Sequence, residues 1–118
     1  MKNEEAIRRE DWVAFLDEFS REHQGSEVDL EIAGIDDNGE IEAREVALQG
    51  VSADVRNGEQ SIAIMVGRDD TPGLTHIVSD AIRLSVNRTA AGNDSGLEIE
   101  SAAGETTRLR LHAVRQPA

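Results

Sequence analysis

The sequence predicts an α+β domain in which one N-terminal amphipathic helix packs on a curved antiparallel sheet, or on a small barrel, of five to seven strands. Three observations favour this fold class. Large apolar side chains recur at helical spacing between Trp12 and Phe19. After Gly25, apolar and polar residues alternate in short segments typical of strands. Tight-turn dipeptides, Asn38-Gly39 and Asn57-Gly58, separate the first of these segments.

Length and charge indicate a single acidic domain over residues 1–118, with 1–6 and 113–118 expected to be frayed. The chain carries 24 acidic and 12 basic residues, which gives a formal net charge of −12. A field of this sign repels phosphate backbones, so we expect no nucleic-acid partner. Of the basic residues only Lys2 is lysine, a bias that fits either an arginine-favouring genome or a high-salt habitat.

The sequence contains no cysteine, which excludes disulfides, thiolate catalysis and cysteine-ligated metal sites. No segment approaches the roughly 18 apolar residues of a membrane span, and the first residues do not resemble a secretory leader. We therefore expect a cytoplasmic protein with no membrane partner.

The helix is expected to begin near Arg8 and to end before Gly25, a natural helix stop. Its apolar stripe follows the i, i+3, i+4, i+7 pattern and comprises Trp12, Phe15, Leu16 and Phe19. These side chains include every aromatic residue of the chain, so we favour a core-packing helix over a partner-binding one.

Alternating segments predict strands at 28–32, 41–48, 51–55, 61–66, 97–100 and 107–111, and at 74–86, read either as two short strands or as one interrupted strand. The alternation slips between Ala43 and Val46, which predicts a bulge or a strong bend. The segment from Ser61 to Val66 is apolar on both faces and is interpreted as the central strand. An Sm-like barrel also begins with a helix followed by five bent strands, and it is the alternative fold.

The last hairpin places acidic and basic side chains on facing strands, with Glu98 and Glu100 on one and Arg108 and Arg110 on the other. Opposite charges across a strand pair stabilise a sheet, so we favour pairing within the hairpin. The alternative is that these arginines and Arg115 contact an acidic partner or a neighbouring subunit.

A set of short motifs spread from about residue 7 to residue 111 resembles an uncharacterised family of short acidic prokaryotic proteins. In this sequence the motifs are Trp12, Phe15-Leu16, Phe19-Ser20, His23 and Gly25, then Ile41-Glu42-Ala43-Arg44, Gly50-Val51-Ser52-Ala53-Asp54 and Leu74-Thr75-His76. The chain departs from the family at Arg8, where a proline often precedes the helix. The resemblance implies a compact single domain and no particular activity.

Histidines are the residues best suited to acid–base or ligand chemistry in this chain. His76 follows an acidic loop with Asp69 and Asp70, and with Asp54 these residues form the candidate pocket. A carboxylate and an imidazole there would suit metal binding or proton transfer, whereas the alternative is a carboxylate–histidine pair of the kind common in ordinary structures. For His23 we favour helix capping over ligation.

His112 is expected to be exposed at the end of the last strand. No second histidine lies at metal-ligand spacing from His76, so we expect no metal and no cofactor.

Other catalytic and binding motifs are missing from the sequence. No serine lies in a Gly-x-Ser-x-Gly elbow, and no glycine loop has the context that cradles phosphate. The segment 36–40 lacks the ligand spacing of a calcium loop and is interpreted as a turn.

The favoured hypothesis is therefore a non-catalytic binding or assembly module, partnered by another protein or by itself through an exposed strand edge. A small-ligand-binding protein or enzyme with a pocket near His76 is the alternative, and an Sm-like RNA binder is the least favoured.

Overall fold

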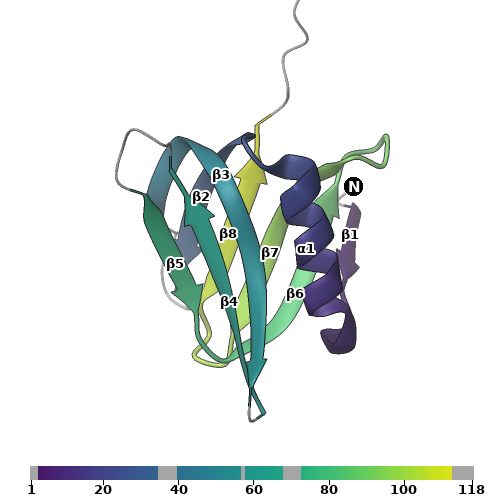
Figure 1. Ribbon diagram of the computed structural model, residues 1–118, viewed down its shortest axis with the longest axis vertical. Coiled ribbons are helices and arrows are strands. Elements are labelled where there is room, and N and C mark those ends of the chain that lie inside the picture. The colour runs from purple at the N-terminus through teal and green to yellow at the C-terminus, as the bar shows by residue number, and fades with distance from the viewer. Residues whose placement is uncertain (1–2, 35–39, 57, 68–72, 113–118) are drawn as a thin grey trace, which may run out of the picture.

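The computed structural model describes residues 3–34, 40–56, 58–67 and 73–112 (Figure 1). These described residues form eight strands, one α-helix and one short 3-10 helix. They are β1 (Asn3–Ala6), the short 3-10 helix η1 (Arg9–Asp11), α1 (Trp12–His23), β2 (Glu27–Ala33), β3 (Glu40–Arg56), β4 (Glu59–Val66), β5 (Leu74–Val78), β6 (Ala81–Arg88), β7 (Asp94–Ser101) and β8 (Thr106–Leu111).

All eight strands belong to one sheet with the order β1-β6-β7-β8-β2-β3-β4-β5, and every neighbouring pair is antiparallel. The predicted fold class, a helix on a curved antiparallel sheet, is confirmed, with one strand more than the expected maximum. Among the described residues β1 and β5 remain as edges, so the sheet does not close and the alternative of an Sm-like barrel is wrong.

Strand β3 joins the two halves of the curved sheet because its first part pairs with β2 and its second part with β4. Ala43 is opposite Leu30 and Val46 is opposite Val28, so β3 has one extra residue between these pairs. Glu45 in this stretch has a φ of 54°. The bulge predicted between Ala43 and Val46 is confirmed, and it bends the strand.

Helix α1 packs on β3 beyond the point where β2 ends its pairing (Figure 1). The hydroxyl of Ser20 donates to the carbonyl oxygen of Val51 and accepts from the amide of Val51, each at 2.8 Å. The helix therefore satisfies backbone groups that a neighbouring strand would otherwise satisfy. Gly25, with a φ of +89°, ends the helix region as predicted.

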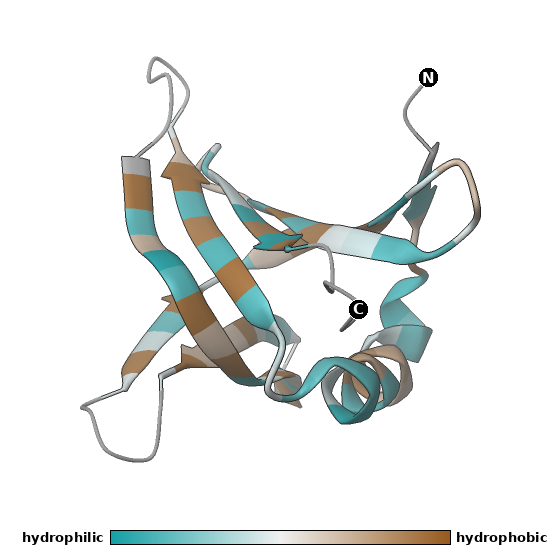
Figure 2. Cartoon of the chain, turned by 90° about the horizontal axis from the view of Figure 1, so that it is seen from above, coloured by the Kyte–Doolittle hydropathy of each residue, from teal (hydrophilic) through white to brown (hydrophobic). Residues whose placement is uncertain are grey.

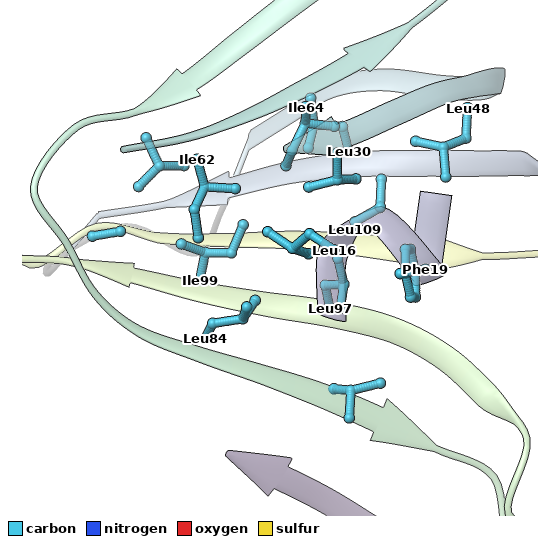
Figure 3. Packing of buried hydrophobic residues seen from close by; sticks show 14 of the residues in the cluster. Leu16, Phe19, Leu30, Leu48, Ile62, Ile64, Leu84, Leu97, Ile99 and Leu109 are labelled. Carbon is cyan, nitrogen blue, oxygen red and sulfur yellow. The ribbon is translucent and has the colours of Figure 1, made fainter. Parts of the chain in front are cut away.

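The core lies between the helix and the two halves of the sheet (Figures 2 and 3). Trp12, Leu16 and Phe19 are buried and Phe15 is partly buried, which confirms the predicted core stripe. Leucines and isoleucines of both sheet halves meet them, among them Leu30, Leu48, Ile62, Ile64, Leu84, Leu97, Ile99 and Leu109. The indole nitrogen of Trp12 donates to the carbonyl oxygen of Ile7 at 2.9 Å, so the ring is buried without an unpaired donor.

Three sequence expectations differ from the structure or are decided by it. Residues 3–6, expected to be frayed, form β1 and pair with β6, whereas 113–118 lie outside the described residues. β4, interpreted as the central strand, is second from the β5 edge. The segment 74–86 forms two strands that turn at Asp80, where φ is 52°.

The described residues include no helix of the length and apolarity that a membrane span requires.

Candidate functional site

The structure does not bring Asp54 to His76. His76 is opposite Ile64, whose side chain is buried, so His76 lies on the inner face of β5. Its Nε2 is 3.4 Å from the hydroxyl oxygen of Thr107 on β8. Asp54 is opposite Ser61, and successive side chains of β4 alternate between faces, so Asp54 lies on the outer face.

Asp69 and Asp70, the other two residues of the candidate pocket, lie outside the described residues. Within the described part of the chain, the side-chain partner of His76 is therefore a threonine of the core. This contact is not the carboxylate–histidine pair that the sequence suggested, and a pocket formed by His76 with Asp69 and Asp70 stays a prediction.

The β5 edge is the least polar edge of the sheet. β5 pairs with β4 on one side, and among the described residues no strand pairs with its other side. Leu74 is 38% exposed and Ile77 is 58% exposed. The sequence Leu-Thr-His-Ile-Val of this strand contains no acidic residue, lysine or arginine.

Uncharged side chains also occupy the outer face of the strands next to β5. Ala63 is opposite Ile77, and Met65 is opposite Thr75. On the next strand Ser52 is opposite Ala63. We refer to Ser52, Ala63, Met65, Thr75 and Ile77 as the uncharged strip. It is a surface without formal charge on a chain of net charge −12.

The β1 edge is built in the opposite way. Glu4 pairs with Arg83 of β6 at 3.5 Å, and Glu5 pairs with Arg88 of the same strand. Carboxylates on an edge strand make pairing with a further strand unfavourable because they would lose hydration. The β1 edge is therefore protected by charge, whereas the described residues of the β5 edge carry no acidic, lysine or arginine side chain.

Charged side chains also cross the outer face of β7, β8 and β2. Arg108 lies 3.2 Å from Glu98 and 3.4 Å from Glu31, and Arg110 lies 3.5 Å from Glu31. The predicted pairing of Glu98 with Arg108 is confirmed, whereas Arg110 pairs with β2 and not with Glu100. We call Glu31, Glu98, Arg108 and Arg110 the charge ladder. Arg115 lies outside the described residues.

His23 pairs with an acidic residue that is distant in sequence. Its Nε2 lies 2.9 Å from Oδ2 of Asp94, the first residue of β7, and both side chains are about one-fifth exposed. The ring nitrogen of His23 is therefore directed to Asp94, whereas the backbone amide of Gln24 donates to the carbonyl oxygen of Ser20 at the end of the helix. The His23–Asp94 pair borders a pocket of about 570 Å³ whose wall also includes Glu22 and His112.

His112, expected to be exposed, lies half-buried between two carboxylates of β2. Its Nδ1 is 3.0 Å from Glu27 and its Nε2 is 2.9 Å from Asp29. The hydrogen bond to Asp29 raises the pKa of His112 above its usual value, with the charges of Asp29, Glu27 and Glu45 acting in the same direction and burial opposing them.

The pKa of Asp29 is shifted in the opposite direction to that of His112. Burial raises its pKa, but the amide hydrogen bond from Glu45 and the contact with His112 outweigh burial, so the pKa of Asp29 lies below its usual value. The charge of Arg44 acts in the same lowering direction. These residues tie β2, β3 and β8 together at one end of the sheet.

Residues 3–117 match the model of a family described as a family of unknown function, DUF5335. The chain belongs to this family. The match confirms the resemblance to an uncharacterised family that the sequence motifs indicated. No curated protein and no solved structure matches the chain. Membership therefore assigns no activity to the domain.

Sequence reasoning missed both histidine–carboxylate groups. His23 and Asp94 are 71 positions apart, so no local spacing joins them. Chemically, the pocket offers imidazole and carboxylate groups to a cation, and the β5 edge offers backbone groups and apolar side chains to another strand.

Proposed function

We propose that this domain is a non-catalytic assembly module that forms a homo-oligomer through the β5 edge. The observation that carries the proposal is an edge strand without acidic, lysine or arginine side chains on a chain of net charge −12. Such an edge is a template for strand pairing, because within the described ranges no strand pairs with the backbone amides and carbonyls on one side of β5.

Burial of β5 under another strand would desolvate apolar or neutral side chains only. Leu74, Thr75 and Ile77 are exposed and would gain contacts. The same pairing at β1 would desolvate the carboxylates of Glu4 and Glu5, a cost that strand hydrogen bonds do not offset. Of the two edges, β5 is the one that favours association.

A second copy of this chain is the partner that fits the edge. Antiparallel pairing of two β5 strands about a two-fold axis at His76 would place Leu74 opposite Val78 and Thr75 opposite Ile77. Each is a pair of apolar or β-branched side chains, which stabilises a sheet. His76 would face His76 of the second copy, the uncharged strips of the two copies would be continuous, and β5 itself would bury no acidic, lysine or arginine side chain.

The proposal is tested by light scattering of the intact chain over a range of micromolar concentrations, with two lysine variants. Ile77→Lys places a charge on the β5 edge, and Ile82→Lys changes an isoleucine of equal exposure (53% against 58%) on β6. We expect the wild type and Ile82→Lys to associate and Ile77→Lys to be monomeric. A wild type that is monomeric at every concentration, or equal masses for both variants, would contradict the proposal.

A further inference from the structure

The pocket at the end of α1 contains three groups that suit a metal ion. Glu22 and His23 belong to the last turn of α1, and Asp94 begins β7. One ligand atom from each residue lies within 4.8 Å of the others. Ligands about 2.1 Å from a zinc ion are separated from one another by no more than about 4.2 Å. A small movement of the exposed Glu22 side chain therefore completes the geometry.

The imidazole and the carboxylate are already held in place by their neighbours. The ring of Phe19 lies against that of His23, with centroids 4.5 Å apart. Nε of Arg88 is 3.5 Å from Oδ1 of Asp94, which leaves Oδ2 turned toward His23. Such outer contacts orient metal ligands and reduce the entropy lost on binding.

The local electrostatics favour a cation. The carboxyl end of a helix carries partial negative charge, and Glu22 and His23 lie in that last turn. The guanidinium of Arg88 opposes a cation at Asp94, but it is also paired with Glu5, and His112 on the same pocket wall is paired with Glu27 and Asp29. Glu22 and Asp94 together contribute two negative charges at the proposed ion position.

The pocket gives an ion access and room for water. Its volume is about 570 Å³, and its wall includes the polar residues Ser26, Asn93 and Ser95 in addition to the three ligands. Imidazole nitrogen favours zinc, nickel or copper over magnesium and calcium, which prefer oxygen ligands alone.

We propose that Glu22, His23 and Asp94 bind one divalent transition-metal ion of the zinc class, with water completing its coordination. This inference is independent of assembly at β5, because the three ligands belong to α1 and β7 and the β5 edge contributes none of them. It assigns to His23 the ligation that the sequence left as the alternative to helix capping.

The test is calorimetric titration of the metal-free chain with zinc chloride, with excess magnesium chloride present to occupy diffuse acidic sites. We expect saturation at one zinc ion per chain. His23→Gln keeps a side chain that can donate to Asp94 but removes the imidazole, and it should weaken binding about tenfold or more. Glu22→Gln should weaken binding to a lesser degree, because Glu22 is the exposed ligand.

Two controls keep the test decisive. His112→Gln changes the other histidine of the pocket wall and should bind zinc as the wild type does. Thermal unfolding without metal shows whether each variant is folded. Absence of saturable zinc binding by the wild type, unchanged binding by folded His23→Gln, or an equal loss in His112→Gln would overturn the assignment.

Discussion

The two edge strands of the sheet differ in the side chains that surround their backbone groups. At β1, Glu4 and Glu5 lie beside arginines of β6, and their charges discourage a further strand. At β5, the exposed side chains are Leu74, Thr75 and Ile77, and the outer face beside them is uncharged. On so acidic a chain, a neutral edge is a local exception. The comparison teaches that charge protects one edge, and that the described residues of the other lack this protection.

The outer faces of the two halves of the sheet also differ in charge. The half that contains β7, β8 and β2 carries the charge ladder, and we call it the charged half. The half that contains β4 and β5 carries the uncharged strip. Pairs in the ladder are partly exposed, so solvent screens them and each contributes little to stability. Stability in both halves comes instead from the shared apolar core and from close strand packing.

The largest effect is expected from a matched pair of glycine substitutions, one in each half. A Cβ at Gly96 of β7 would overlap the carbonyl oxygen of Leu109, whereas a Cβ at Gly50 of β3 would lie 3.7 Å from the nearest atoms, in ordinary contact. Gly96→Ala should lower the free energy of unfolding by about 3 kcal/mol. Gly50→Ala should change it little, as measured by urea denaturation. Equal losses would contradict the reading that the carbonyl oxygen of Leu109 excludes a side chain at Gly96.

Removing the charges from the protected edge is expected to have the next largest effect. The double substitution Glu4→Thr and Glu5→Thr leaves β1 neutral, so this edge should also pair between copies and raise the association constant roughly tenfold, or about 1.4 kcal/mol. Sedimentation velocity measures the change. Glu42→Thr with Glu59→Thr removes the same charge from other exposed strand positions. If this control associates equally, total charge and not edge protection governs assembly.

Raising the salt concentration should change the association constant moderately, and the direction of the change identifies the kind of contact. Two copies of net charge −12 repel each other, and raising ionic strength from about 0.1 M to 1 M shortens the screening length from about 10 Å to 3 Å. Association through the β5 edge should therefore strengthen with salt in light scattering. Weakening with salt would indicate a contact between opposite charges, such as one made by the charge ladder.

The smallest effect is expected from pH at the charged half. The pKa of His112 is raised by Asp29, so its contribution to stability is complete below the unfolded value of 6.5 and is lost as pH rises through the higher folded value. The pKa of Asp29 is lowered, so its contribution is present above 3.8 and is lost as pH falls through the lower folded value.

The substitution His112→Gln tests this pH dependence. As pH rises through the raised folded pKa of His112, the wild type should lose part of its advantage over the variant in thermal unfolding, because the ring deprotonates there. A constant difference as pH rises would mean that the carboxylates of Glu27 and Asp29 do not stabilise the protonated ring.

Local patterns were sufficient to predict the parts of the fold that local sequence determines. The helical stripe, the stop at Gly25 and the bulge after Ala43 all follow from neighbouring residues. The double-sided apolar pattern of β4 was interpreted as central burial. The structure gives another reason, since Ala63 and Met65 are half-buried members of the uncharged strip and only the other face lies in the core.

Features that depend on distant pairing could not be predicted in the same way. β1 forms because four residues at the start of the chain pair with 85–88, and nothing in an acidic tetrapeptide indicates that partner. The contact of His23 with Asp94 and the contacts of His112 with β2 likewise depend on topology. The sequence itself contains the uncharged composition of 74–78, by contrast, whereas only the strand order shows that this segment is an edge strand.

Hydrogen exchange of the two edges as a function of protein concentration tests assembly at β5 most directly. Pairing between copies should protect the backbone amides of β5 progressively as the concentration rises through the micromolar range, while the amides of β1 keep one exchange rate. Concentration-independent exchange at β5, or equal protection gained at β1, would contradict the account.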